Sequence, residues 1–301
     1  MPVSDKLSMD KAILHWRRVC IIGCLLLLGA CSSTNFVYNR LDFLIPWYVD
    51  DYVDLNAQQK RYLEKEIPPF LAWHRSDELP DYLKILEGIE DNLSRPQTPE
   101  MFVAIFGDVE TAWLRLESKG LDWLLGLGEQ LSDAQIAQLM EELWETQVAY
   151  KEKYLERTEE EFFEETYEES IDSVQEYLGS LSDEQRKLLE AFSRSMQRSD
   201  RFWLQERAQW LTELAVLLER KPGWQQRVRA AIVARRDNAS PEYRRVYDHN
   251  LNAAFEVAAK VLSGRSEQQD EHLRDRLAFL SEDIEALIAE GAAPPAVAPT
   301  D

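Results

Sequence analysis

The stretch Gly179-Ser180-Leu181-Ser182-Asp183-Glu184-Gln185 decides the fold, because the two longest segments without glycine or proline lie on either side of it. Residues 132–178 and 183–221 both carry apolar residues at helical spacing. At 1.5 Å per residue these arms would be about 70 and 57 Å long, and helices of that length need a partner for their apolar stripe. We therefore predict a long antiparallel helical hairpin over residues 132–221.

The turn itself has the residues of a helix stop followed by a helix start. Gly179 suits the left-handed position that closes a helix, while Ser182 and Gln185 have the spacing of a capping box. The same pattern occurs at Leu131-Ser132-Asp133-Ala134-Gln135 and, more weakly, at Leu55-Asn56-Ala57-Gln58-Gln59. We expect ordinary helix capping at all three, with structural caps formed by Leu55, Gln59, Leu131, Ser132, Gln135, Leu181, Ser182 and Gln185.

Charge along the hairpin predicts its register. Residues 141–169 contain twelve acidic and three basic residues, whereas residues 186–236 contain twelve basic and five acidic residues. A fold at positions 180 and 181 makes the numbers of facing residues sum to about 361. The expected pairs are Arg194 with Glu165 or Glu168, Arg198 with Glu161 or Glu164, Arg201 with Glu160, and Arg207 with Glu152 or Glu156.

The first thirty residues differ from the rest and have the pattern of a lipoprotein signal peptide. A basic start precedes the apolar residues 19–28, which are too few to span a bilayer, so a retained transmembrane helix is the lesser alternative. The segment Leu28-Gly29-Ala30-Cys31 resembles a lipobox. This resemblance implies cleavage after residue 30 and a diacylglycerol and palmitate anchor on Cys31, and it leaves no cysteine pair for a disulfide.

Position and charge predict the compartment and limit the partners. The residue after Cys31 is Ser32 and not the aspartate that retains lipoproteins in the inner membrane, which predicts the periplasmic face of the outer membrane. The chain has a net charge of −21, and removal of residues 1–30 takes away four basic and two acidic residues, which gives −23. Such a charge disfavours nucleic acid and anionic lipid surfaces as partners.

The remaining segments have the pattern of shorter helices, so we predict an all-α fold. We expect an elongated helical bundle of about nine helices over residues 31–290, followed by a disordered tail at 291–301. We expect Pro46 to split the aromatic segment 35–54 into two helices, Pro68-Pro69 to end a helix, and Gly120, Gly126 and Gly128 to loosen the chain before the hairpin. The aromatic residues of segment 35–54 either form an interfacial foot near the lipid or pack under the bundle, and the second arrangement is favoured.

Between Pro69 and Pro80 lies the segment that most resembles a functional loop. It brings together the candidate interaction residues Trp73, His74, Arg75, Asp77 and Glu78. The alternative, which we favour, is a structural corner between two helices in which His74 and Arg75 pair with Asp77 or Glu78.

Two resemblances bear on function. With its lipobox, the Tyr38-Asn39-Arg40-Leu41 and Pro46-Trp47-Tyr48 segments and the Trp73-His74-Arg75 corner, the chain resembles an uncharacterised family of proteobacterial lipoproteins with no assigned activity. The Leu-Ser-x-x-Gln copies are also similar to the Leu-Thr-x-x-Gln motifs of the Spy and CpxP periplasmic chaperones. The second resemblance implies a helical protein that binds other proteins.

No residue pattern identifies a catalytic, metal or cofactor site. Beyond residue 31 the histidines are His74, His249 and His272, none at zinc-ligand spacing, and no phosphate-binding glycine loop is present. We therefore predict a non-enzymatic module that binds envelope proteins, with a weak chaperone or holdase as its specific form. The alternative is a peptidoglycan- or glycan-acting hydrolase or lyase that uses carboxylates such as those of Glu168-Glu169-Ser170.

Overall fold

The computed structural model describes residues 33–235 and 237–292, and every regular element in this part of the chain is helical. The predicted all-α class is confirmed, with more helices than the nine expected. The predicted signal peptide, Cys31, Ser32 and residues 293–301 of the predicted tail lie outside the described residues. The elements are α3 (Ser33–Tyr38), α4 (Leu41–Asp50), α5 (Ala57–Trp73), the π-helix η1 (His74–Glu78), α6 (Leu79–Leu93), α7 (Pro99–Gln130), α8 (Asp133–Leu155), α9 (Glu159–Leu178), α10 (Asp183–Ser195), α11 (Asp200–Leu217), α12 (Trp224–Ala234), α13 (Pro241–Ser263) and α14 (Glu267–Ala292).

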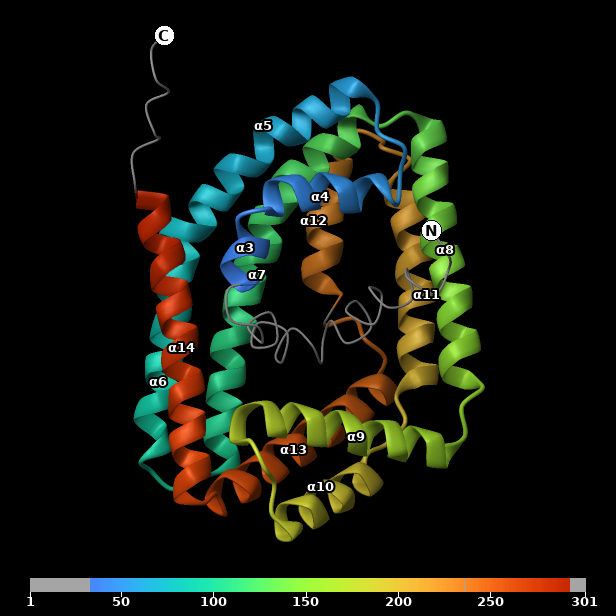
Figure 1. Ribbon diagram of the computed structural model, residues 1–301. Helices are drawn as coiled ribbons and strands as arrows, with labels where there is room; N and C mark the ends of the chain where they lie inside the picture. Colours follow the sequence, from blue (N-terminus) through green and yellow to red (C-terminus); the bar gives the residue numbers. More distant parts are fainter. Residues whose placement is uncertain (1–32, 236, 293–301) are drawn as a thin grey trace.

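The helices are arranged as the four sides of a frame (Figure 1). Helices α6, α7 and α14 form one side, and the α8–α11 pair forms the opposite side. Helices α4 and α5 lie along one end, while α9, α10 and α13 lie along the other, and α12 projects between the sides. None of the described helices combines the length and the apolar character needed to cross a membrane.

The hairpin is present, but each arm is bent. The first arm is interrupted between α8 and α9 at residues 156–158, and the second between α10 and α11 at residues 196–199. The break in the first arm starts a new helix, because the Thr158 hydroxyl accepts a hydrogen bond from the Glu161 amide and the Glu161 carboxylate accepts one from the Thr158 amide. The expectation of two uninterrupted arms was therefore wrong, and the two helix pairs form different sides of the frame.

The predicted register was also wrong, by about seven residues. Arg194 pairs with Glu160 at 3.2 Å, and Arg207 donates to the Gln147 side chain at 2.8 Å, so the numbers of facing residues sum to 354. The two breaks lie opposite one another, but the Glu160–Arg194 pair lies between them and the turn, so the shift is already present in α9 and α10. At this elbow Arg198 donates to the carbonyl groups of Tyr154 and Arg157 and pairs with Asp200, in place of the expected Glu161 or Glu164.

Prolines and glycines expected to break helices lie inside them. Helix α5 continues through Pro68 and Pro69, which face solvent, so the carbonyl groups of Glu64 and Lys65 that lose an amide partner lie on the exposed side of the helix. Pro46 lies within α4, and the break comes earlier, between α3 and α4.

The glycines of α7 permit close packing. A Cβ atom at Gly126 would lie 2.0 Å from the Tyr62 hydroxyl of α5, and one at Gly128 would lie 2.9 Å from the Trp224 ring of α12. A side chain at either position would collide with the neighbouring helix, so glycine lets α5 and α12 approach α7 without interrupting it. The expected loosening of the chain before the hairpin was therefore wrong.

Apart from α3, η1 and α12, the described helices form two halves with the same order of contacts. Helices α4, α5, α6, α7 and α8 correspond to α9, α10, α11, α13 and α14: α4 packs on α5 as α9 packs on α10, and α5 packs on α7 as α10 packs on α13. The last helix of each half packs on the other half, α8 on α11 and α14 on α6. The halves therefore complete one another, which closes the frame.

Candidate functional site

The predicted functional loop is a π-helical turn inside a continuous helical segment. Residues His74–Glu78 form η1, between α5 and α6. A π-helix accommodates one extra residue per turn and is frequent at functional sites. Here it turns His74, Arg75 and Glu78 toward different neighbours, which are α3, the turn after α3, and α7.

His74 holds the N-terminal helix α3. Its Nδ1 atom lies 2.7 Å from the Tyr38 hydroxyl, and its Nε2 atom lies 3.4 Å from the Tyr82 hydroxyl. Burial, with a smaller contribution from the neighbouring Arg75 charge, lowers the pKa of His74 from 6.5 to about 4. The imidazole is therefore neutral at neutral pH and joins α3 to α6 through two hydroxyl groups.

Arg75 extends the same junction to the C-terminal helix. Its guanidinium group donates to the Asn39 side chain and stacks over the Tyr38 ring at 5.0 Å, and Asn39 donates to Glu290 of α14 at 2.8 Å. Tyr38, Asn39 and Glu290 are far from Arg75 in sequence, so this junction joins the beginning and the end of the described chain.

Glu78 is buried and faces away from that junction, toward α7. Its carboxylate accepts two nearly parallel hydrogen bonds from Arg115, at 2.8 and 2.9 Å, while the Glu78 residue is only 3% exposed. The expected pairing of His74 and Arg75 with Asp77 or Glu78 is not formed, because Asp77 accepts a bond from Ser76 and Glu78 is paired with Arg115. These residues join elements of the fold, and neither concavity described below includes them.

The predicted caps meet in pairs. Gln59 and Gln135 each close the capping box of their own helix and also exchange two side-chain hydrogen bonds, at 2.9 and 2.8 Å. Gln185 forms the same double bond with Gln269, at 3.0 and 2.9 Å. Each pair joins the N-termini of two helices, α5 with α8 and α10 with α14, so these motifs position whole helices in the frame.

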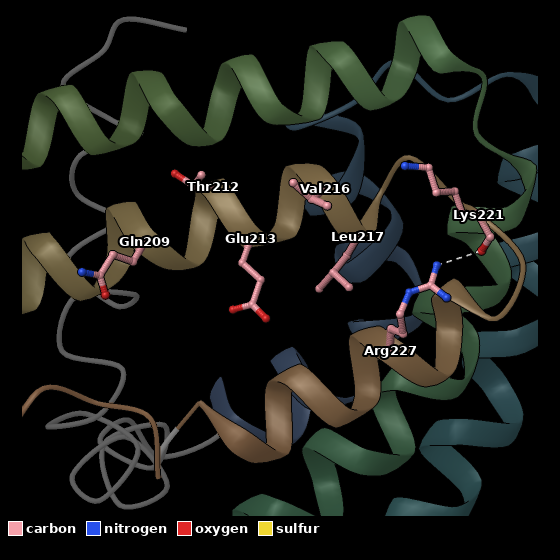
Figure 2. Close-up of a pocket in the computed structure, with 7 residues that line it drawn as sticks. All are labelled: Gln209, Thr212, Glu213, Val216, Leu217, Lys221 and Arg227. Carbon is pink, nitrogen blue, oxygen red and sulfur yellow. Dashed lines mark hydrogen bonds between the residues drawn. The ribbon is translucent and has the colours of Figure 1, made fainter.

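A solvent-facing concavity of about 630 Å³ lies between α11 and α12. Figure 2 shows Glu213 and Leu217 extending from α11 toward α12, while Arg227 donates to the Lys221 carbonyl group. Val216 is 59% exposed and lines the same concavity. Among the described residues, Glu213 has no hydrogen-bond or ion-pair partner, whereas Arg227 is bonded to two carbonyl groups and Lys221 is paired with Glu219.

A second concavity of about 670 Å³ lies where α6, α13 and α14 meet. Its charged groups are engaged with one another, since Asp270 accepts from both Arg265 and Arg274 at 2.6 and 2.8 Å. These two arginines and hydrogen bonding lower the pKa of Asp270. Within residues 33–235 and 237–292, no cluster of three or more His, Cys, Asp or Glu residues is arranged to hold a metal ion.

Comparison with known proteins places the chain in a family. The model of a family of unknown function, DUF6279, matches residues 51–244, which is more than half of the chain. The chain belongs to this family. No curated protein and no solved structure matches it. The part matched by DUF6279 includes the bent hairpin and the α11–α12 concavity.

Sequence reasoning missed several residues of these sites. The fourth motif of the DUF6279 protein, Ser266 with Gln269, keeps the Ser-x-x-Gln spacing but has Arg265 where the other copies have leucine. Thr158 with Glu161 also had a readable capping spacing. Arg115 carried no local signal, because its partner Glu78 lies 37 residues away and only the fold brings them together.

Proposed function

We propose that this DUF6279 protein is a lipoprotein, anchored through Cys31 to the periplasmic face of the outer membrane, that binds other envelope proteins without catalysing a reaction. The observation that carries the binding function is the α11–α12 concavity, which is lined by the exposed Val216 and by Glu213, whose carboxylate has no partner among the described residues. The anchor rests on the sequence alone, on the short apolar segment before Cys31 and on Ser32 after it.

The lining of the concavity indicates the chemistry of its partner. Val216 offers exposed apolar contact, whereas Leu217 is buried in the core beneath the concavity. Glu213 offers an acceptor for a basic side chain, while the two nearby basic side chains are engaged. An extended or helical segment with alternating apolar and basic residues would fill this site. The net charge of −21 would favour the approach of basic segments and repel acidic ones.

Such a site would make the protein a weak holdase for partly unfolded envelope proteins. Segments with exposed apolar and basic side chains are those that a folded protein hides and an unfolded one presents. The similarity of the paired capping motifs to those of the Spy and CpxP chaperones supports the same proposal. Binding at one shallow site would be weak and reversible and would need no ATP.

Aggregation of a denatured client tests the proposal. We expect the chain from residue 33 onward to slow aggregation of a basic client at equimolar concentration, and to leave an acidic client unaffected. Val216→Asp should abolish the effect, and Val103→Asp should keep it, because Val103 is similarly exposed but lies on α7. Equal protection by both variants, or none by the wild type, would contradict the proposed site.

The anchor has its own test, which is labelling of cells with a palmitate analogue. The wild type should be labelled and recovered with outer membranes, and Cys31→Ser should be neither. A labelled, membrane-bound Cys31→Ser chain would contradict acylation at this residue.

The alternative function, a glycan hydrolase or lyase, predicts a different result. It requires release of soluble fragments from purified peptidoglycan, and we expect none. Its candidate residues Glu168, Glu169 and Ser170 lie in the middle of α9, where the Ser170 hydroxyl donates to the Thr166 carbonyl group at 2.6 Å. They line neither concavity, and no described contact favours this alternative.

A further inference from the structure

Helix α4 is apolar on both of its sides. Ile45 and Val49 pack against the core cluster that contains Leu63 and Ile67. Phe43 and Trp47 lie on the opposite side, four residues apart, and are 66% and 38% exposed. A helix that is apolar all round is normally buried, yet α4 has no buried residue. The side that bears Phe43 and Trp47 is therefore available to a partner.

The exposed aromatic surface continues into α3. Phe36 is 60% exposed, Val37 is 40% exposed, and the Arg40 guanidinium group lies 4.8 Å above the Phe36 ring. We call residues 33–50 the N-terminal foot. The expectation that the aromatic residues pack under the bundle holds for Tyr38, which packs against the core, and is wrong for Phe36, Phe43 and Trp47, which are exposed.

The foot is held in a fixed position on the body of the protein. Tyr38 is bonded to His74, and Asn39 bridges Arg75 of η1 and Glu290 of α14. Helix α4 packs along α5, and Figure 1 shows it lying across one face of the frame. The outer side of the foot is therefore presented as a rigid surface.

We propose that this outer side lies in the interfacial layer of a lipid bilayer, next to the lipid on Cys31. The inference rests on the acylated anchor of the proposed function. Helix α3 begins two residues after Cys31, and two residues span at most about 7 Å, so an inserted acyl chain would hold the foot against the membrane surface.

The residue types and the charge of the foot both suit contact with a lipid bilayer. Aromatic rings favour the region between hydrocarbon and water, and Phe36, Phe43 and Trp47 are the most prominent side chains of the foot. The foot contains one basic and two acidic residues, Arg40, Asp42 and Asp50, and the Asp50 carboxylate is paired with Lys60 of α5, so the foot carries little unbalanced charge in a chain of net charge −21. Anionic lipids would repel the acidic body of the protein, but they would not repel the foot.

Quenching by brominated lipids tests the proposal on the full acylated protein. A fluorescent bimane is attached to single cysteines at position 43 or 47, and at position 103 or 114 as matched controls, because Val103 and Leu114 of α7 are 51% and 50% exposed. The protein is reconstituted into vesicles of phosphatidylethanolamine and phosphatidylglycerol that carry brominated acyl chains. We expect fluorescence at 43 and 47 to fall at least about twofold and fluorescence at 103 and 114 to stay unchanged.

The outcomes separate this inference from the proposed binding function. Protein that floats with the vesicles but is not quenched at 43 and 47 would overturn the inference and leave the anchor standing. Quenching that depends on protein concentration and not on bromine would identify a second copy of the chain as the occupant, which also overturns it. Quenching at the foot in a protein that protects no client would support the inference and refute the holdase.

Discussion

At the scale of single residues, His74 makes stability depend on pH. Its pKa is lowered from 6.5 to about 4 in the folded protein by burial and by Arg75, so the unfolded chain binds the proton more readily between these values. The contribution of the neutral His74 ring to the unfolding free energy is complete above pH 6.5 and is lost as the pH falls toward 4. The groups that face the ring are the hydroxyls of Tyr38 and Tyr82 and the guanidinium of Arg75.

The unfolding free energy of the wild type should fall when the pH is lowered from 7 to 4.5. In His74→Gln this fall should be smaller by about 2 to 3 kcal/mol, at 1.36 kcal/mol per pKa unit. Urea unfolding at the two pH values measures it. His249→Gln is the control, because His249 is an exposed imidazole that contacts the Ser195 carbonyl group. The same pH dependence in wild type and His74→Gln would show that His74 does not contribute.

Glu78 and Arg115 form the second residue-scale prediction. Because Glu78 is 3% exposed, Arg115→Met would leave a buried carboxylate without a partner and cost about 3 kcal/mol of unfolding free energy. Glu78→Met with Arg115→Met should cost less than Arg115→Met alone, since no charge is then stranded. Lys260→Met breaks the exposed Lys260–Glu256 pair and should cost less than about 1 kcal/mol. A double variant no more stable than Arg115→Met would argue against a stranded charge.

At the scale of helices, the paired glutamines fix how two helix starts meet. Gln135→Leu would remove both bonds to the buried Gln59 side chain and the bond to the Asp54 carbonyl group. We expect a loss of about 2 kcal/mol, and a similar loss for Gln269→Leu, from buried amide groups left without partners. Gln58→Leu, on the exposed neighbour of Gln59, should change stability by less than about 0.5 kcal/mol. Equal effects at positions 58 and 135 would mean that the pairing contributes nothing.

The same helices show which features could be read from the sequence. Capping at Ser132 and Ser182 depends on residues three apart, so it could be predicted, and the apolar stripes predicted the hairpin. The passage of α5 through Pro68 and Pro69 depends on which side of the helix faces water, and the Gln59–Gln135 pair joins residues 76 apart. Neither feature is marked by nearby residues in the sequence, so both could be recognised only once the fold was known. The exposed foot could not be predicted for the same reason, since an apolar segment alone does not show which side is covered.

At the scale of the whole molecule, the bent hairpin makes a prediction about distances. Cysteines at positions 160 and 194, in a Cys31→Ser chain without residues 1–30, should be joined readily by a short, reducible thiol crosslinker, because the side chains of Glu160 and Arg194 meet. Cysteines at 164 and 198, which straight arms would bring together, should react much more slowly. Gel mobility with and without reductant measures both. Faster reaction of the 164–198 pair would contradict this register and favour the one in which facing residues sum to about 361.

The central claim for the whole molecule is that the α11–α12 concavity binds segments that combine apolar and basic side chains. Fluorescence anisotropy of a labelled peptide that alternates leucine and lysine, titrated with the protein, tests it most directly. We predict saturable binding that weakens with salt, that weakens at least about tenfold with Glu213→Gln or Val216→Asp, and that is unchanged by Val103→Asp. Equal binding of a leucine–glutamate peptide, or wild-type affinity in the Glu213→Gln and Val216→Asp proteins, would contradict the claim.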